Sequence, residues 1–404
     1  MMRAPVVLLL LHIGCGEAPE VEPSPTPTES PDPALFAACT FILGPDGQTG
    51  LVGTVDSLDA DGTFDPAEAI EFADGRPICA SDGESLFVSS PVSPEVTRYD
   101  LQDGALVPGP TVSFANLGIG PLAGIQPELM QFVSDDRAYL VDPVSQQVAV
   151  FDPTAMEVRG AIALDIEPPE GTVASGVRGI LRTGDDVVIP FSLASAQGIA
   201  ISTTIFAVVD TVTDDVTYAT STNCGSLAGS QQTTSGALVF ASNEVSAVVN
   251  AAELPGAFQP CLLDKEEGVP FETANLIDLQ ALAGGDLAGG FARGPGNTAF
   301  FNAFDETIAP LPEGDPFEAL GVPAWTVRRI ADLDAAETSE PVLGVPPGAG
   351  RLQWSFVDGR SFVIVLAADF ASTTLYEVTN VDADTPATEA LTAPAIVYSL
   401  FRLR

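Results

Sequence analysis

Residues 148–164 read VAVFDPTAMEVRGAIAL. An apolar run of strand length ends at Asp152, a short polar turn follows, and a second run rich in β-branched residues begins. Val, Ile and Phe suit a pleated, half-buried strand, whereas an Asp side chain closes a turn by accepting hydrogen bonds from backbone N–H groups. The stretch therefore predicts two antiparallel strands joined by a turn that Asp152 holds.

The same pattern recurs along the chain. It begins again at Val52, Thr97, Ile205, Val245, Thr326 and Thr374, and the full set of anchor residues is Asp56, Asp100, Asp152, Asp210, Asn250, Asp332 and Asn380. The spacing is roughly 40–60 residues, apart from one longer gap between Asn250 and Asp332. Such a spacing is typical of propeller blades, in which each anchor would end the third strand. We predict an all-β body over residues 36–404, a β-propeller of about seven four-stranded blades. A pair of β-sandwiches or an irregular β-solenoid stays open, because no WD or kelch signature is present.

Further short runs of strand length support the all-β prediction, and they include Ser85–Ser89, Val187–Phe191 and Ser361–Leu366. The first and last runs of the body, Cys39–Leu43 and Ala395–Leu403, are both strand-like. Two terminal strands that share one blade would close the ring of a propeller.

The N-terminus has the pattern of an export signal. Arg3 precedes an apolar run, and Gly14-Cys15 follows it, which resembles the lipobox of bacterial lipoproteins. We predict a signal peptide over 1–14 and lipidation of Cys15, although His12 stands where that motif usually has Leu. An ordinary signal peptide with an incidental Cys is the alternative, and the run is shorter than the ~20 residues of a membrane span.

The segment that follows is an acidic, Pro-rich linker. Residues 16–34 read GEAPEVEPSPTPTESPDPA and offer nothing to bury. We expect residues 15–35 to form a lipidated, disordered tether that attaches the body to a membrane. Because neither Gly16 nor Glu17 is the Asp that retains lipoproteins in the inner membrane, we expect anchoring in the bacterial outer membrane, in either leaflet.

Four cysteines remain in the body after the signal: Cys39, Cys79, Cys224 and Cys261. An even number in an exported chain predicts two disulfides, for which three connectivities exist. The pairs Cys39–Cys79 and Cys224–Cys261 each close a local loop, and we favour them. Four free buried thiols are the alternative.

Charge and histidine content exclude several classes of function. The formal charge is −40, from 55 acidic and 15 basic residues, so binding to nucleic acid or to anionic lipid through charge is disfavoured. The single histidine, His12, lies in the predicted signal peptide. The mature chain would therefore lack imidazole acid–base catalysis and His-ligated zinc, and we expect a protein that is not an enzyme.

One acidic turn is a weak candidate for calcium. Asp59, Asp61 and Asp65 alternate as oxygen ligands do in a calcium loop, but the Gly and Glu positions of an EF-hand are not met. A solvated hairpin turn explains the same residues. We expect no other cofactor.

Arginines gather in the last part of the sequence, where Arg328, Arg329, Arg351 and Arg360 lie close together along the chain. In neighbouring blades they could form a positive island that binds carboxylate or phosphate groups. The alternative is that each of them pairs with a nearby Asp or Glu.

The segment Phe41–Leu164 resembles a group of myxobacterial and related deltaproteobacterial lipoproteins. The likeness rests on FILGPDGQTGLVGTVDSLDADG (41–62), SPEVTRYDLQDGAL (93–106) and RAYLVDPVSQQVAVFDPTAMEVRGAIAL (137–164). Members of this group are β-propellers, some encoded beside genes for the catecholate siderophore myxochelin. The resemblance implies a propeller lipoprotein and, for some members, a role near iron acquisition; it implies no catalytic residue.

Together these features favour a lipid-anchored propeller that binds or scaffolds an envelope protein or a small ligand. An accessory or receptor lipoprotein in siderophore-iron uptake is the alternative that the resemblance suggests. A hydrolase or lyase that uses carboxylates in a central channel is the third hypothesis.

Overall fold

The structure is a computed structural model that describes residues 35–403 apart from 45–46, 73–74, 125, 253–257, 314–315, 349–352 and 368. The predicted signal peptide, Cys15, nearly all of the linker, and Arg351 lie outside the described residues. The description below concerns the unit Ala34–Arg404.

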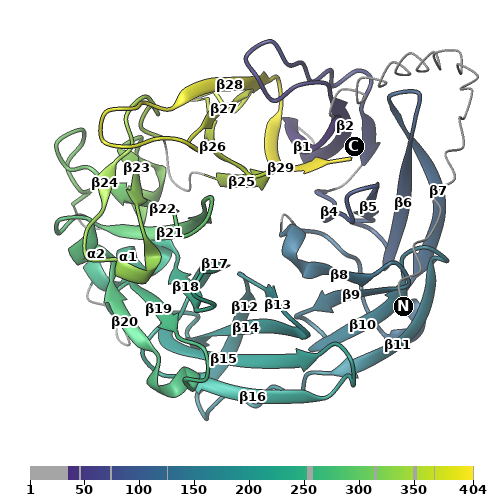
Figure 1. Cartoon of the computed structure of the whole chain (residues 1–404), viewed down its shortest axis with the longest axis horizontal. Helices are drawn as coiled ribbons and strands as arrows, with labels where there is room; N and C mark the ends of the chain where they lie inside the picture. The colour runs from purple at the N-terminus through teal and green to yellow at the C-terminus, as the bar shows by residue number, and fades with distance from the viewer. Residues whose placement is uncertain are drawn as a thin grey trace, which may run out of the picture. The chain divides into compact units, whose positions relative to one another are not determined.

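Over the described residues, the strands form seven antiparallel sheets arranged in a ring, which we number as blades 1 to 7 (Figure 1). From the innermost strand outward, the first three are blade 1, β29 (Ile396–Arg402), β1 (Phe36–Gly44), β2 (Gly47–Val55) and β3 (Ile70–Phe72); blade 2, β4 (Cys79–Ser81), β5 (Ser85–Ser89), β6 (Glu95–Gln102) and β7 (Ala105–Ser113); and blade 3, β8 (Met130–Ser134), β9 (Arg137–Asp142), β10 (Gln147–Asp152) and β11 (Glu157–Ala163).

The other blades continue the ring in chain order. They are blade 4, β12 (Thr172–Val177) with β13 (Leu181–Thr183), β14 (Asp186–Ser195), β15 (Ala200–Asp210) and β16 (Val216–Ser221); blade 5, β17 (Leu227–Gln232), β18 (Leu238–Ser242), β19 (Cys261–Lys265) and β20 (Asn275–Asp278); blade 6, β21 (Ala288–Arg293), β22 (Ala299–Phe304), β23 (Trp325–Ile330) and β24 (Glu340–Pro341); and blade 7, β25 (Gln353–Val357), β26 (Arg360–Leu366), β27 (Thr373–Glu377) and β28 (Thr388–Ala393). The predicted seven-bladed β-propeller is confirmed, and neither the sandwich pair nor the solenoid is formed.

Helices in the described part are short. They are α1 (Glu244–Ala251), α2 (Leu279–Leu282), η1 (Ala115–Leu117), η2 (Pro127–Leu129), η3 (Phe271–Thr273), η4 (Pro316–Gly321) and η5 (Leu333–Ala335). None of these helices has the length and apolar character needed to cross a membrane.

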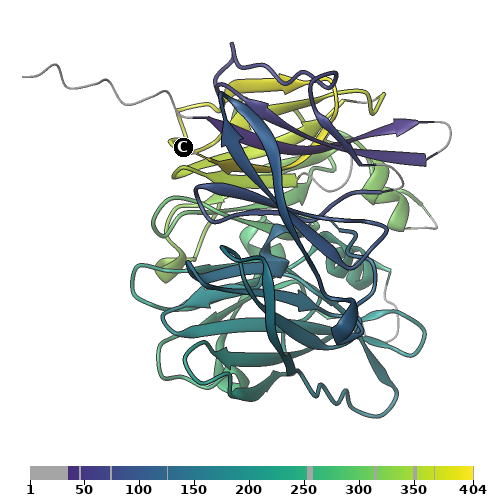
Figure 2. The ribbon, with the colours of Figure 1, turned by 90° about the vertical axis from the view of Figure 1, so that its right-hand side faces the viewer.

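Blade 1 closes the ring. Its innermost strand, β29, comes from the C-terminal end and pairs with β1, so that Ser399 lies opposite Cys39. The Leu403 N–H donates to the Leu35 carbonyl at 2.9 Å, which extends the pairing by one bond. Strands from both ends of the described chain thus share one blade, as predicted, and their β1–β2 hairpin extends beyond its neighbours in Figure 2.

Both predicted disulfides are present. Cys39 on β1 bonds to Cys79 on β4 across 40 residues and joins blade 1 to blade 2. Cys224, which precedes β17, bonds to Cys261 on β19 across 37 residues. Because such bonds persist in oxidising compartments, they indicate an exported protein.

Asp-anchored turns follow third strands as the sequence predicts. Asp152 ends β10, and its carboxylate accepts the N–H groups of Thr154 and Ala155 at 3.0 and 2.7 Å. Asp210 ends β15 and accepts two N–H groups in the same way. Each bond satisfies a backbone donor that the turn would otherwise leave unpaired.

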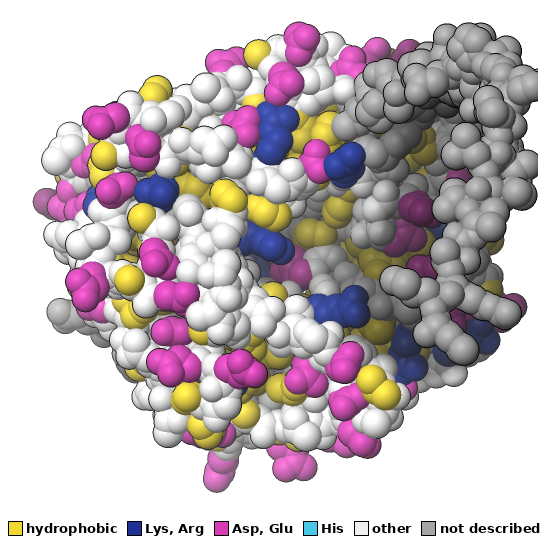
Figure 3. Space-filling view, viewed as in Figure 1, with side chains coloured by type: hydrophobic (Ala, Val, Ile, Leu, Met, Phe, Trp, Pro, Cys, Tyr) yellow, Lys and Arg dark blue, Asp and Glu magenta, His cyan; other side chains and the backbone are white. Residues whose placement is uncertain are grey.

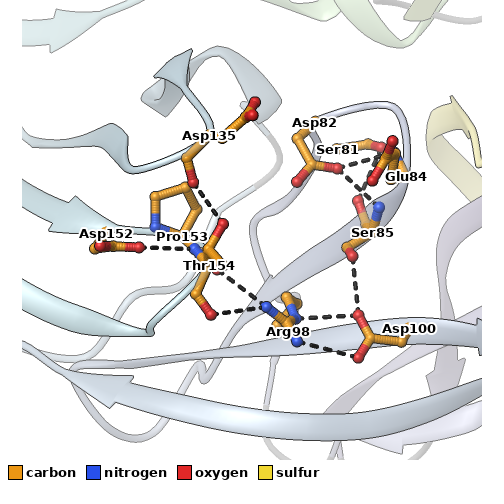
Figure 4. Close-up of polar contacts among 10 residues, drawn as sticks. All are labelled: Ser81, Asp82, Glu84, Ser85, Arg98, Asp100, Asp135, Asp152, Pro153 and Thr154. Atoms are coloured by element: carbon orange, nitrogen blue, oxygen red, sulfur yellow. Dashed lines mark hydrogen bonds and ion pairs between the residues drawn. The ribbon is translucent and has the colours of Figure 1, made fainter.

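Asp100 has a different role from the one predicted. It lies inside β6 and binds Arg98, at 3.0 Å between Nε and Oδ1, and the Ser85 hydroxyl at 2.9 Å. Arg98 in turn donates to the Thr154 carbonyl at 2.9 Å, so this ion pair links blade 2 to the hairpin of blade 3 (Figure 4).

The strand expected around Asn250 is a helix. Asn243 caps α1 by accepting the Ser246 N–H at 3.2 Å, and Asn250 lies within the helix. The apolar run that begins at Val245 suits a buried helix as well as a strand, and the N-cap favours the helix. The third strand of blade 5 is β19 instead.

Apolar side chains fill the spaces between neighbouring blades. One buried cluster takes residues from blades 2, 3 and 4, and Phe114 meets Phe151 within it at 5.5 Å between ring centroids. Between blades 4 and 5, Phe206 stacks on Phe271 at 4.0 Å. This packing on both faces of each sheet fixes the positions of the innermost strands.

Candidate functional site in the central channel

A cavity of about 640 Å³ occupies the centre of the ring. Each of the seven blades lines it, through its innermost strand or the loop next to that strand. β21 contributes Gly290–Arg293, β25 contributes Gln353–Phe356, and β29 contributes Tyr398–Phe401. Since four consecutive strand residues span about 10 Å, the cavity extends along much of these strands.

Charged side chains of both signs line this channel. Among the described residues, the cations are Arg76, before β4; Arg178, between β12 and β13; and Arg293, at the end of β21. The anions are Glu128 in η2 and Glu244 at the start of α1. Three positive and two negative groups give the lining a formal charge of +1, although the whole chain carries −40.

The surface on one face shows the same contrast. In Figure 3, some basic side chains border the central hollow and others lie nearer the edge, whereas acidic side chains are spread over much of the periphery, with a few inside the hollow. The channel therefore differs in charge from the surface that surrounds it.

Two of the channel arginines contact aromatic rings and not carboxylates. The Arg76 guanidinium lies 5.0 Å from the centroid of the Phe41 ring, and that of Arg293 lies 4.3 Å from the Phe356 ring. Within the described residues neither side chain makes an ion pair or hydrogen bond. Loss of hydration lowers the pKa of Arg293, which remains a cation at neutral pH. Both can therefore offer N–H donors to a bound anion.

Arg178 and Glu128 form the third charged element of the channel. Burial raises the pKa of Glu128, while its own N–H, the Gly179 N–H and the charge of Arg178 act in the opposite direction. The Gly179 N–H lies 3.4 Å from Oε1 of Glu128. Glu128 therefore releases its proton at a higher pH than a solvated glutamate does.

Glu244 reaches the channel because β21 contains two glycines. A Cβ on Gly290, whose φ is +78°, would lie 2.4 Å from Oε1 of Glu244, and one on Gly289 would lie 2.6 Å from its Cα. The carboxylate is buried and accepts the Asn302 Nδ2 at 2.6 Å. Gly289 and Gly290 thus provide the space that this side chain needs.

Three buried polar atoms of the channel wall have no protein partner among the described residues: Oε1 of Gln353, Nε1 of Trp354 and Oγ of Ser399. They come from β25 and β29, which are neighbours in the ring. A buried polar atom without a partner costs about 1–3 kcal/mol. Each of these atoms is itself buried, so the fold bears this cost at the channel wall.

The predicted arginine site lies away from the channel. Arg328 and Arg329 are on β23, the third strand of blade 6, and Arg360 is on β26. Arg328 binds Ser339; Arg329 pairs with Glu340 at 3.2 Å, and Arg360 with Glu377 at 2.6 Å. A ligand-binding role for these residues, and for Arg351, stays a prediction.

The residues proposed for calcium lie in the loop after β2. Asp59 pairs with Arg360 at 2.9 Å, and Asp65 accepts the Ala67 N–H at 2.9 Å. Within the part of the chain that the structure describes, no three acidic, His or Cys side chains gather as metal ligands would. Calcium binding through Asp59, Asp61 and Asp65 stays a prediction.

Sequence reasoning did not single out the residues that line the channel. Arg76, Arg178 and Arg293 are far apart along the chain, and no local pattern joins them. Arg76 stands just before an innermost strand and Arg293 at the end of one. That position is the signal by which they could have been found once the innermost strands were assigned.

No protein-family model matches the chain, and no curated protein matches it. Solved structures do match. The periplasmic gluconolactonase of Pseudomonas aeruginosa is 12% identical, with a TM-score of 0.57 over 92% of this chain and 99% of that one. A protein from Bacteroides uniformis described as a candidate 6-phosphogluconolactonase is 9% identical, with a TM-score of 0.55 over 91% and 99%. A protein from Lactobacillus plantarum is 10% identical, with a TM-score of 0.52 over 92% and 99%.

At these identities the likeness shows a shared fold and nothing further. The class that fold and sequence define is a seven-bladed β-propeller with two disulfides and a charged central channel.

Proposed function

We propose that this protein is an exported, envelope-anchored propeller that binds a small organic anion in its central channel. The observation that carries the proposal is the placement of Arg76, Arg178 and Arg293 around one cavity in a chain of charge −40. Guanidinium groups bind carboxylates through paired N–H donors.

The acidic surface does not prevent such binding. At physiological ionic strength, charges are screened over about 8 Å, so an anion inside the channel feels the nearby arginines more than the distant rim. The rim lowers the rate at which anions arrive, and the arginines lower the rate at which they leave. The ring holds the three guanidinium groups in fixed positions, which reduces the entropy lost on binding.

The N-terminus supplies the proposed anchor. Lipidation of Cys15, with the Pro-rich linker as tether, would attach the propeller to the outer membrane, and the two disulfides support an exported location. Membrane fractionation with metabolic labelling by a radioactive fatty acid tests this. The native chain is expected in the labelled membrane fraction, and Cys15→Ala in the unlabelled supernatant. Labelling that survives Cys15→Ala would contradict the proposal.

Hydrolysis of a lactone is a second candidate function. It is favoured by the raised pKa of Glu128 beside Arg178, and two proteins of similar fold bear the name of lactonases. In this hypothesis Glu128 accepts a proton from water, water adds to the lactone carbonyl, and the ring C–O bond breaks as its oxygen takes the proton. The product is one hydroxy acid from one lactone and one water, and Arg178 binds the developing negative charge. Glu128→Gln would abolish the turnover and leave binding of the hydroxy acid intact.

Calorimetric titration of the full chain tests anion binding. The probes are D-gluconate, citrate and a ferric tris-catecholate complex, the last of which addresses the predicted link to siderophore iron. At least one probe is expected to bind at one site, at least tenfold more weakly in Arg293→Gln and unchanged in Arg329→Gln, the matched control on β23. Failure of all three to bind, or equal losses in both variants, would overturn the proposal. Binding to an envelope protein stays a prediction, tested by affinity purification from gently solubilised membranes.

A further inference from the structure

A second cavity of about 270 Å³ lies beside the channel. Its walls come from β12, the β14–β15 turn, the start of β17, α1 and η4, so it lies among blades 4, 5 and 6.

The channel and this side pocket share a wall. Arg178 lines both cavities, because the innermost strand of blade 4 is interrupted between β12 and β13 at that residue. On β17, Leu227 lines the side pocket and the next residue, Ala228, lines the channel. One guanidinium is thus within reach of ligand atoms in either cavity.

The break in the strand depends on glycine. Gly179 has a φ of +73°, and a Cβ there would lie 2.8 Å from the backbone of Gly229 on β17. The close approach of blades 4 and 5 at this point holds Arg178 between the two cavities.

The lining of the side pocket suits an apolar group. Leu227, Val245, Val249 and Phe317 line it, and no acidic side chain does so among the described residues. Its hydroxyls already have partners within the protein. Ser175 donates to the Ser192 carbonyl at 3.0 Å, the Ser192 hydroxyl accepts the Leu227 N–H at 2.9 Å, and the Ser226 hydroxyl donates to Asn243 at 3.1 Å.

We propose that the side pocket is a subsite for the apolar part of an amphiphilic organic anion whose negative group binds Arg178. The inference rests on the proposed function of the channel and adds the chemical class of the ligand: a carboxylate or sulfonate that bears an aromatic or acyl group. The polar end occupies the channel, and the apolar end enters between α1 and the β14–β15 turn. Burial of that end removes apolar surface from water, which stabilises the complex.

The probe for this subsite is 8-anilinonaphthalene-1-sulfonate, an amphiphilic anion that fluoresces in apolar surroundings. We expect saturable binding to the full chain, weakened at least tenfold by Val245→Trp, which fills the pocket, and by Arg178→Gln. Val212→Trp, at a valine that is 71% exposed on the β15–β16 turn, is the matched control and should leave the affinity unchanged. Ile199→Trp fills the pocket from the opposite wall and replaces Val245→Trp if that variant fails to fold.

Citrate titrations separate this proposal from that of the channel. Citrate has no large apolar part, so its binding should survive Val245→Trp and be lost in Arg178→Gln. If citrate fails to bind the native chain while the fluorescent probe still depends on Val245, the channel proposal loses support and the apolar pocket stands. Absence of saturable probe binding, or an affinity that neither pocket-filling variant changes, would overturn the subsite.

Discussion

The arginines of the channel and those of the outer strands differ in their partners. Arg98, Arg329 and Arg360, which lie on the second or third strands of their blades and are called the outer arginines below, each pair with a carboxylate, at 3.0, 3.2 and 2.6 Å. In the channel, Arg76 and Arg293 contact aromatic rings and have no carboxylate partner within the described residues. Outer arginines thus stabilise the fold, whereas Arg76 and Arg293 remain available to a ligand, at a cost in stability that is typical of functional sites.

The largest expected effect concerns the disulfide between blades 1 and 2, which helps to hold the propeller that carries both groups of arginines. Replacing Cys39 and Cys79 by Ala removes the link between blades 1 and 2, and a loop of 40 residues then gains entropy when the chain unfolds. The chain-entropy model gives a loss of about 3–4 kcal/mol. Urea denaturation under oxidising conditions measures it, with the Cys224/Cys261 double variant as a second case of similar loop length. A loss below 1 kcal/mol would show that packing alone closes the ring.

The next effect separates the outer arginines from those of the channel. Arg360→Met removes a cation bonded to Glu377 at 2.6 Å and to Asp59 at 2.9 Å, and leaves the Glu377 carboxylate with the Thr379 hydroxyl but without its cationic partner. The free energy of unfolding should fall by about 1–2 kcal/mol. An unchanged midpoint in urea would contradict the structural role assigned to this arginine.

Arg293→Met is the matching change in the channel. Burial opposes the charge of Arg293, and no acidic group compensates it among the described residues. Its removal should therefore change stability by less than about 0.5 kcal/mol or increase it, because loss of the guanidinium contact with the Phe356 ring is offset by removal of a desolvated charge. A loss above 1 kcal/mol would show that Arg293 serves the fold and not a ligand.

The smallest effect is a change in pH dependence. Burial raises the pKa of Glu128, so the folded chain holds this proton to a higher pH than the unfolded chain does. Its contribution to the free energy of unfolding therefore falls as the pH rises from about 4.5 through the raised pKa. Glu128→Gln removes this pH dependence. The difference in free energy of unfolding between the variant and the native chain should therefore favour the variant more at pH 8 than at pH 4. Glu157→Gln, at an exposed site on β11, is the control and should show no such difference.

The sequence predicted the fold well because local chemistry determines it. The amino-acid sequence itself shows apolar runs of strand length, Asp residues at turns such as Asp152 and Asp210, and strand-like runs at both ends of the body. The disulfides followed from loop length. The helix α1 was not predicted, because an apolar run of that length is compatible with a strand and with a helix. The N-cap at Asn243 favours the helix.

The candidate site could not be predicted in the same way. Arg328 and Arg329 are adjacent in sequence, yet they lie on a third strand, whereas Arg76, Arg178 and Arg293 come together only when the ring closes. The space for Glu244 depends on Gly289 and Gly290, which in the sequence resemble any glycine-rich loop. Side chains that converge on a propeller axis leave no periodic signal, because each blade contributes its own residue at its own position.

The measurement that tests the central claim most directly is anomalous diffraction from crystals soaked in sodium bromide. Bromide reports where an anion prefers to bind, whatever the natural ligand is. The account predicts the strongest anomalous peak inside the channel, in contact with Arg178 or Arg293, and its loss in Arg293→Gln crystals. Bromide peaks confined to the outer surface, with none in the channel, would contradict the claim that these arginines form an anion site.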